Sequence, residues 1–245
     1  MKTDWHCHIL PGLDDGPASI EESIEMARAL ADAGFTTVHC TPHCIRGLYN
    51  NTAAQVKVAT RELQEAIDKV GISLVLVPGF EYYLDEFFID DIADPLPLSG
   101  NLLLVESSAS CISQLFLETI TQVIQKGFTP LIAHPERSKL FPSEIDQGDN
   151  GFNKYFTRFR TSFLGGSILK TGNVNLKSDS LFEVLRSMGC LFQGNLGSFA
   201  GLYGDQVRHN AEYLRSAGLY THYGSDLHSI RDKDILLINP ATQIS

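Results

Sequence analysis

The chain has 245 residues, 43% of them hydrophobic and 20% charged, and carries a formal net charge of −10. Such a length and composition are typical of one soluble globular domain with a large apolar core. The acidic charge argues against nucleic acid and anionic membranes as partners. Cations bound by some of the carboxylates would nevertheless admit an anionic substrate.

The sequence predicts a cytoplasmic protein. Residues 1–6 lack the charged start, apolar stretch and cleavage site of a signal peptide. No apolar run is long enough to span a bilayer, so direct membrane insertion is not expected. The cysteines are odd in number and scattered, which favours reduced thiols. They are Cys7, Cys40, Cys44, Cys111 and Cys190.

Short apolar runs alternate with amphipathic segments, a pattern that favours a mostly parallel α/β fold. Ser19 and Glu22 form a capping-box pattern, in which Ser19 is the N-cap and Glu22 reaches back to it. In chain order we expect strand Thr3–His6, a helix between Ser19 and Gly34, strand Thr36–Cys40, helix Thr52–Val70, strands Leu74–Pro78 and Leu102–Glu106, helix Ser110–Lys126, strand Pro130–Ala133, helix Ser180–Met188, strand Cys190–Gln193, helix Asp205–Ala217 and strand Leu219–Tyr223. These make about seven βα-like units, one fewer than the standard eight-stranded barrel.

One segment interrupts this alternation. Residues 138–179 are rich in glycine, asparagine, aspartate, serine and aromatic residues, which indicates an irregular insertion. No repeat, low-complexity tract or linker divides the chain, so we expect a single domain over residues 1–245.

Histidine and acidic residues follow most of the predicted strands. In a parallel barrel the carboxyl ends of the strands meet at one face, where the active site lies. One histidine after a strand is a weak signal, but ligand-type residues after six strands indicate a metal site. The candidates are His6, His8, Asp14, Asp15, His43, Glu81, Glu106, His134, Asp226 and His228.

The spacing of these residues favours cation binding. Residues two apart in an extended segment point the same way, so His6 and His8 can bind one ion, and Asp226 and His228 repeat the pattern. Mixed imidazole and carboxylate ligands suit Mn²⁺, Fe²⁺ or Zn²⁺. Because the candidates are too many for one ion, we expect two or three, with Glu81 as a natural bridge between two of them.

Arg137 is the best candidate for binding phosphate, because its planar guanidinium can contact two phosphate oxygens. The alternative is a surface salt bridge with a neighbour such as Glu136. Gln193–Ser198 ends the sixth strand, and its Asn195 and Ser198 could orient substrate or water, or the segment could be a tight turn.

Two other patterns involve cysteine. His39, Cys40, His43 and Cys44 could form a structural zinc site, but His39 and Cys40 would point to opposite faces of a strand. The spacing from Cys40 to Arg46 matches cysteine phosphatases, yet that loop has no glycine, and its proline removes a backbone donor that a phosphate cradle needs. We therefore interpret these cysteines as packing residues.

Several segments resemble one known family in its own order. They are Asp4–Gly16, Thr41–His43, Gly79–Tyr83, Ala133–Arg137, Gln193–Ser198 and Ser225–His228. Together they resemble the PHP-domain (polymerase and histidinol phosphatase) protein-tyrosine phosphatases of bacterial capsule and exopolysaccharide operons. The resemblance covers most of the chain, and its opening motif is specific.

The resemblance implies a distorted (β/α)7 TIM-like barrel whose metal site, usually loaded with manganese, lies at the C-terminal ends of the strands. It implies one metal held by His6, His8, Glu81 and Asp226, and a second held by Glu81, Glu106 and His134. A third would be held by Asp15, His43 and His228. Asp15 is preferred to Asp14 because the family's ligand directly precedes the glycine.

The implied function is hydrolysis of phosphotyrosine in the tail of a tyrosine kinase that controls polysaccharide export. Water activated by the cations would attack phosphorus in line, with Arg137, Glu81 and His43 as catalytic residues. The family's Arg-Pro-Pro after Ser-Asp-x-His is missing here, and we expect Arg231 or Lys233 to replace its arginine in phosphate binding.

Three alternatives stay open. One is a PHP phosphatase for a small phosphomonoester such as histidinol phosphate, and another is an amidohydrolase-like enzyme. The third is a metal-binding but inactive regulator that binds a phosphoprotein. Homo-oligomerisation also stays open.

Overall fold

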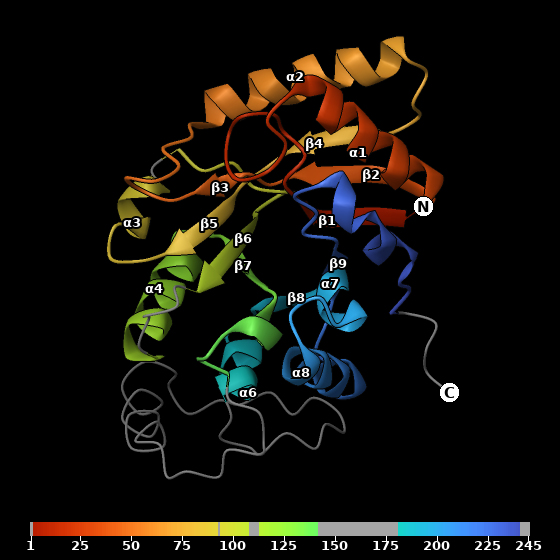
Figure 1. Cartoon of the computed structure of the whole chain (residues 1–245). Helices are drawn as coiled ribbons and strands as arrows, with labels where there is room; N and C mark the ends of the chain where they lie inside the picture. Colours follow the sequence, from red (N-terminus) through yellow and green to blue (C-terminus); the bar gives the residue numbers. More distant parts are fainter. Residues whose placement is uncertain (1, 93, 108–112, 142–180, 241–245) are drawn as a thin grey trace.

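The computed structural model describes residues 2–92, 94–107, 113–141 and 181–240 (Figure 1). The insertion predicted at residues 138–179 therefore lies almost entirely outside the described residues. Within them the chain forms nine strands: β1 (Lys2–Cys7), β2 (Phe35–Cys40), β3 (His43–Cys44), β4 (Val75–Pro78), β5 (Glu81–Leu84), β6 (Leu102–Ser107), β7 (Thr129–Ala133), β8 (Leu191–Asn195) and β9 (His222–Gly224).

The five predicted helices are confirmed, and several short helices that were not predicted accompany them. They are α1 (Ile20–Asp32), α2 (Ala53–Lys69), α3 (Phe88–Asp91), α4 (Ser113–Gln125), α6 (Leu181–Ser187), α7 (Leu196–Ala200) and α8 (Asp205–Ser216), with 3-10 helices η1 (Pro135–Arg137) and η2 (Ile230–Leu237). Ser19 caps α1 as predicted by accepting a hydrogen bond from the Glu22 backbone N–H. The prediction for the Glu22 side chain is wrong by one residue, because it accepts from the backbone N–H of Ala18 instead.

The strands form two parallel sheets whose spatial order follows the chain. A three-stranded sheet has the order β1-β2-β4, and a six-stranded sheet has the order β3-β5-β6-β7-β8-β9. The expectation of about seven strands is wrong in number because two predicted strands are extended by short second segments. After a break at Thr41 and Pro42, β3 continues the path of β2, and β5 continues β4 after Gly79 and Phe80.

The first and last strands also lie side by side. Cys7 and Leu227 form an isolated parallel bridge, and the His8 N–H donates to the Leu227 carbonyl at 3.1 Å. The Asp226 N–H donates to the His6 carbonyl at 2.7 Å. The sheets are nevertheless separate, so the described residues show an α/β fold with parallel sheets rather than the closed barrel that the resemblance implies.

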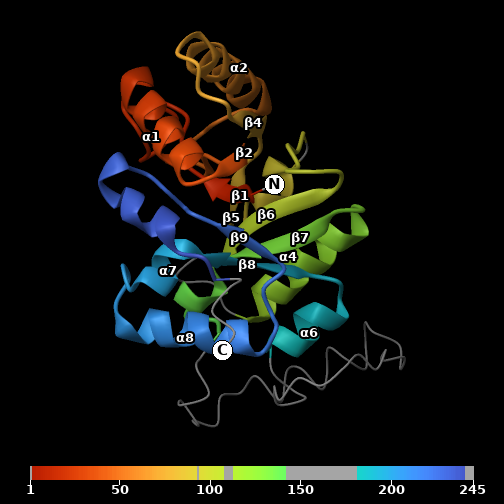
Figure 2. The same cartoon turned by 90° about the vertical axis from the view of Figure 1, so that its right-hand side faces the viewer.

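Both faces of the central strands are buried. Leu103 of β6 and Ile132 of β7 belong to the main core, whereas their neighbours Leu104 and Leu131 belong to a second apolar cluster that Trp5 also contacts. Helices α1 and α2 lie together beside the three-stranded sheet, and α4, α6 and α8 lie beside β7 and β8 (Figures 1 and 2). Because side chains alternate between the two faces of a strand, Glu106 lies on the same face of β6 as Leu104. The candidate ligands therefore lie next to the second apolar cluster, towards the carboxyl ends of the strands.

A bulge in β1 sets the direction of its side chains. Asp4 pairs with Val38 and Cys7 with Cys40, so three steps along β1 match two along β2. The extra residue allows neighbouring Trp5 and His6 to face the same enclosed side, because a bulge reorients the side chains around it.

In the described part of the chain, no helix is both long enough and apolar enough to cross a membrane.

His39 is a buried histidine away from the candidate ligands. Its ring stacks on Trp5 at 4.4 Å between centroids and 11° between planes. Burial, with a smaller contribution from the charge of His222, lowers the pKa of His39 from 6.5 to about 4.

We expect His39 to make the fold sensitive to acid. Between pH 6.5 and about 4 the unfolded chain takes up a proton that folded His39 resists. The free energy of unfolding should therefore fall as the pH drops through this window, by ~3 kcal/mol from this group. Urea titrations from pH 7 to 4 should show a weaker pH dependence for His39→Gln than for wild type. Exposed His209, changed to Gln, is the control, and equal slopes for the His39 variant and wild type would refute the assignment.

Candidate metal centre

The ligand-type residues meet at the carboxyl ends of the strands. Three groups of them offer ligand atoms that all lie within 4.8 Å of one another. The groups are His6, His8, Glu81 and Asp226; His8, Asp15, His43 and His228; and His43, Glu81 and Glu106. Residues in or just after five strands (β1, β3, β5, β6 and β9) thus supply one compact cluster.

The first group contains two imidazole nitrogens that face each other. His6 Nε2 lies 3.0 Å from His8 Nε2. His6 Nδ1 lies 3.1 Å from Gln193 Oε1, an acceptor whose orientation is set because Gln193 Nε2 donates to the Gly194 carbonyl. His8 Nδ1 lies 2.7 Å from the Asp14 carboxylate.

These contacts fix the tautomers. Both Nδ1 atoms carry hydrogens that they donate, so in neutral rings both Nε2 atoms present lone pairs to each other. Facing lone pairs repel unless a cation lies between them. The oxygens that fix the ring nitrogens are arranged as they are around histidines that bind metals. The residues therefore fit a bound divalent cation.

Glu81 lies at the centre of the cluster. Its Oε2 lies 3.3 Å from Nε2 of both His6 and His8, and 3.0 Å from His43 Nδ1. Its Oε1 lies 2.9 Å from His134 Nε2. Although it is buried, Oε2 accepts no hydrogen bond of good geometry from the described residues. An oxygen surrounded by imidazole nitrogens but left without a donor suits a metal ligand.

The charges of the cluster are strongly coupled. Burial alone would lower the pKa of His6, but the carboxylates of Glu81 and Asp226 raise it to about 9. Burial would likewise raise the pKa of Asp226, yet His6 and the other histidines hold it well below its usual range. Binding a metal must displace these imidazole protons, so metal affinity should rise with pH.

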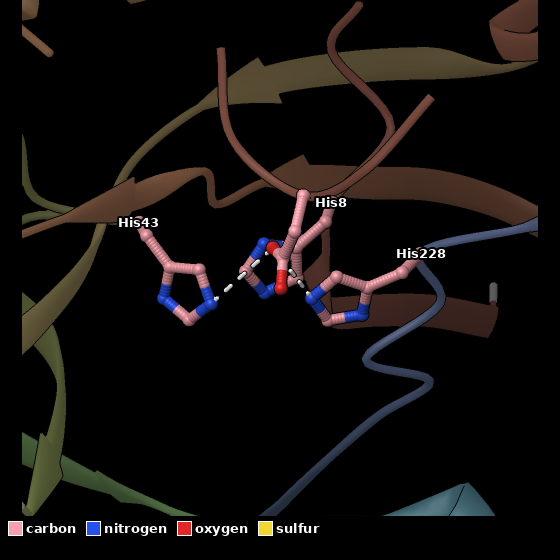
Figure 3. Close-up of side chains that lie close together, drawn as sticks. His8, His43 and His228 are labelled. Carbon is pink, nitrogen blue, oxygen red and sulfur yellow. Dashed lines mark ion pairs between the residues drawn. The ribbon is translucent and has the colours of Figure 1, made fainter. Parts of the chain in front are cut away.

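The second group lies at the mouth of the site. His8, His43 and His228 converge from different parts of the chain (Figure 3). Asp15 Oδ1 lies 3.6 Å from His43 Nε2 and 3.4 Å from His228 Nε2. Nδ1 of His228 lies 2.9 Å from the Asp226 carbonyl oxygen and donates to it, which leaves Nε2 as the ligand atom.

Asp14 and Asp15 have different surroundings. Asp14 accepts from His8 Nδ1 and, at 3.0 Å, from the His43 backbone N–H, so it orients two candidate ligands. Asp15 faces the opening. This arrangement agrees with the preference for Asp15 as the ligand, which stays a prediction.

The set predicted for the second metal, Glu81, Glu106 and His134, is partly assembled. His134 Nε2 is close to Glu81 but lies 3.8 Å from Glu106 Oε1. The structure groups His43, rather than His134, with Glu81 and Glu106. His134 lies next to this trio, and its place among the ligands stays a prediction.

Two candidate ligands have unusual backbone conformations. Asp226 has φ of 53° and His134 has φ of 28°, and they are the non-glycine residues with positive φ among those described. Such conformations are costly and persist where the surroundings enforce them, often at functional sites. Gly224 allows β9 to approach β1, since a Cβ there would lie 2.4 Å from the Cβ of His6.

A cavity of about 450 Å³ opens over the cluster. It is lined by Asp15, His43, Ile45, Leu48, Tyr49, Glu81, Glu106, His134, Arg137, Tyr203, Asp226 and His228. The floor is polar and charged, and one side, from Ile45 to Tyr49, is apolar and aromatic. Such a cavity is large enough for a small organic group with a charged end.

Arg137 points into this cavity. Its Nη1 lies 2.5 Å from Asp226 Oδ2, and its guanidinium carbon lies 4.2 Å from the centre of the Tyr203 ring. The alternative of a surface salt bridge with Glu136 is wrong, because Glu136 is buried and Arg137 pairs with Asp226.

The other predicted substrate residues lie elsewhere. Asn195 is buried, caps α7 and donates from Nδ2 to Asp226 Oδ2 at 2.8 Å, so it supports a candidate ligand. Ser198 is buried, and its hydroxyl has no hydrogen-bond partner among the described residues. Arg231 is exposed and does not line the cavity. Their roles in binding substrate stay predictions.

Three contributors to the site have roles that the sequence did not predict. Gln193 was expected only as part of the segment Gln193–Ser198, Asp14 was a candidate ligand and not a residue that orients ligands, and Tyr203 was not predicted. Asp14 and Gln193 act through hydrogen bonds to histidine rings, and Tyr203 packs on Arg137. The position of Gln193 near the end of a predicted strand was the one sequence feature that could have indicated its place in the site.

The cysteine alternatives find no support. Cys40 is fully buried, and burial raises the pKa of its thiol far above the usual range, so it does not form the thiolate that a nucleophile requires. The groups of potential ligands found among the described residues contain no cysteine.

Comparison with known proteins shows the family of this chain. Residues 2–150 match the family described as capsular polysaccharide synthesis, CpsB/CapC. The chain belongs to this family. It is 30% identical to the tyrosine-protein phosphatase YwqE of Bacillus subtilis over 94% of this chain and 79% of the relative. It is 28% identical to the putative tyrosine-protein phosphatase CapC of Staphylococcus aureus over 96% of this chain and 80% of the relative.

A solved structure of the CpsB/CapC family has a similar fold. It belongs to a study of YwqE from Bacillus subtilis and CpsB from Streptococcus pneumoniae, described as unique metal-dependent tyrosine phosphatases. The TM-score is 0.72 at 29% sequence identity, covering 94% of this chain and 81% of the solved chain. The parallel α/β fold is therefore shared with this solved relative.

Proposed function

We propose that this chain is a metal-dependent phosphomonoester hydrolase that removes phosphate from phosphotyrosine in a protein. The observation that carries the proposal is the pair of facing Nε2 atoms of His6 and His8, with Arg137 over the same cluster. The relatives named as tyrosine-protein phosphatases support the choice of reaction.

We propose that two or three divalent ions, with Mn²⁺ preferred to Fe²⁺ or Zn²⁺, bind the three ligand groups. Imidazole and carboxylate ligands suit these ions. When bound, such cations lower the pKa of water and offset the charge of phosphoryl oxygens. The sets would be those predicted from the sequence, with His134 close to the trio of His43, Glu81 and Glu106.

The chain's own residues would bind and orient the phosphate. Arg137 can direct N–H groups at phosphoryl oxygens, and its stacking on Tyr203 limits its freedom. Gln193 and Asp14 hold the rings of His6 and His8 so that Nε2 faces the centre. The apolar side of the cavity would contact the phenyl ring of the substrate.

We further propose that the two sheets act as an interrupted, distorted (β/α)7 barrel within one domain. The order of the strands and the Cys7–Leu227 bridge support this. The proposed substrate protein is a tyrosine kinase of polysaccharide export, which the family description supports through its link to capsule synthesis.

The direct test measures metal content and hydrolysis of a phosphotyrosine peptide. Chelation should reduce turnover to background, and Mn²⁺ should restore it, because the cluster supplies charge stabilisation only when it is loaded. Two or three metals per chain with restored turnover would support the proposal. Metals without turnover would favour the inactive regulator, and faster turnover of small phosphomonoesters would favour a small-molecule phosphatase.

Tyr203 should contribute to hydrolysis by holding the Arg137 guanidinium against its ring. We expect Tyr203→Ala to lower kcat/KM for a phosphotyrosine peptide by ~10-fold, since a stacked guanidinium gains about 1–2 kcal/mol. Tyr203→Phe should retain most activity, and Leu202→Ala, an exposed neighbour, is the control. An alanine variant with wild-type kcat/KM would show that the stack does not matter for catalysis.

A further inference from the structure

Glu136 is a buried acid that the proposed mechanism does not use. It lies in η1 between His134 and Arg137, with 3% of its surface exposed. Burying a carboxylate is costly unless hydrogen bonds compensate it. Its contacts therefore indicate what it does in the fold.

The contacts of Glu136 join η1 to three other elements. Its Oε1 accepts from the Asn195 backbone N–H at 3.0 Å, at the end of β8. Its Oε2 accepts from the Tyr220 hydroxyl at 2.8 Å, just before β9. Its backbone carbonyl accepts from Asn210 Nδ2 at 3.2 Å, in α8. Both carboxylate oxygens are thus engaged by neutral donors.

These bonds complete a closed ring of contacts around Arg137. Asn195 donates from Nδ2 to Asp226 Oδ2 at 2.8 Å. The same oxygen accepts from Arg137 Nη1 at 2.5 Å. Because Arg137 directly follows Glu136, the path from Glu136 through Asn195, Asp226 and Arg137 returns to its starting point. A shift of η1 would disturb both donors of Asp226.

Tyr220 strengthens this arrangement. Burial, together with the charge of Glu136, raises the pKa of the Tyr220 phenol well above its usual range. The hydroxyl therefore remains a donor at ordinary pH, and the bond to Glu136 persists.

We propose that Glu136 is a positioning residue that holds the Arg137 guanidinium over the metal centre, where it meets phosphate. The inference rests on the proposed function, because it assigns phosphate binding to Arg137. Glu136 does not contact the Arg137 guanidinium in this arrangement. Its carboxylate oxygens accept hydrogen bonds from Asn195 and Tyr220, so they do not compete with phosphate for the guanidinium.

The test is the Kd of inorganic phosphate for the metal-loaded protein, measured by calorimetry. Glu136→Ala should weaken binding by ~10- to 100-fold, as expected for residues that support a site indirectly. The double variant with Arg137→Ala should bind no more weakly than Arg137→Ala alone, because Glu136 acts through Arg137. Unchanged affinity in Glu136→Ala, or losses that multiply in the double variant, would overturn the proposal.

Two further variants keep the test decisive if Glu136→Ala does not fold. Glu136→Gln retains an acceptor for Asn195 and an amide that can donate to Tyr220, so it should bind phosphate nearly as well as wild type. Tyr220→Phe should weaken binding by a smaller factor, and only when Arg137 is present. If Tyr220→Phe binds as tightly as wild type, or weakens binding equally without Arg137, the proposal is wrong. Glu118→Ala, on the exposed surface of α4, is the matched control.

Phosphate binding needs no turnover, so the two proposals can fail separately. Wild-type protein that binds phosphate but hydrolyses nothing would refute the proposed function. The effects of the Glu136 and Arg137 variants on phosphate binding could still be measured in that case. Wild-type protein that hydrolyses the peptide while Glu136→Ala binds phosphate normally would refute only the role of Glu136. Metal-loaded wild-type protein that does not bind phosphate would refute the role of Glu136 as well.

Discussion

Glu81→Ala protein should lose metal-dependent turnover by ~10³-fold or more, because bound cations contribute several kcal/mol of charge stabilisation. Glu81 contacts four histidines of the cluster and belongs to two of the three ligand groups. Its removal leaves Asp226 as the one carboxylate of the first ligand group. Metal content, measured by elemental analysis, should fall together with turnover.

The matched control for Glu81 is Glu86→Ala, an exposed acid close by in sequence. It should keep wild-type metal content and turnover. Circular dichroism would establish that both variants are folded. A folded Glu81→Ala protein with full metal content and full turnover would show that the ligand cluster has been misidentified.

Arg137→Ala should keep its metals but lower kcat/KM by ~10²- to 10³-fold, the usual loss when one preorganised donor to developing charge is removed. Asn195 still donates to Asp226 in this variant, so that ligand remains oriented. Arg137→Lys should recover only part of the loss, because an ammonium group cannot contact two oxygens in a plane. Steady-state kinetics on the phosphotyrosine peptide, with metal content measured in parallel, would check both expectations.

Arg208→Ala is the control for Arg137, since Arg208 is exposed and pairs with Asp205 at 2.9 Å on the surface of α8. It should behave as wild type. If Arg137→Ala also loses its metals, the residue supports the metal centre and the assignment to phosphate fails.

Local sequence patterns predicted the helices and most strands well. The cap at Ser19 depends on a few neighbouring residues and was found as expected, although Glu22 reaches Ala18 and not Ser19. The short strands β3 and β5 were missed because each has at most four residues and begins after a two-residue break behind the preceding strand. They pair with each other, and β5 also pairs with β6, which no local pattern reveals.

The candidate site was predictable where ligand-type residues follow strands. Alternation predicted that His6 and His8 would act together, and their Nε2 atoms do face each other. The supporting residues were harder to predict because they act through single contacts between distant segments. Gln193 is 187 residues from His6, and Glu136 is 84 residues from Tyr220. Such contacts follow from the assembled fold, not from any motif.

The position of β1 beside β9 has a consequence for how the protein is made. Asp4 accepts a hydrogen bond from Ser225, 221 residues later in the chain. During synthesis His6, His8 and Glu81 emerge long before Asp226, so the growing chain holds three of the four residues of the first ligand group until its last strand is made. Since metal binding depends on ligands that folding brings together, capture of the cation is coupled to docking of the last strand. A chain with its metals bound has therefore already joined its first strand to its last.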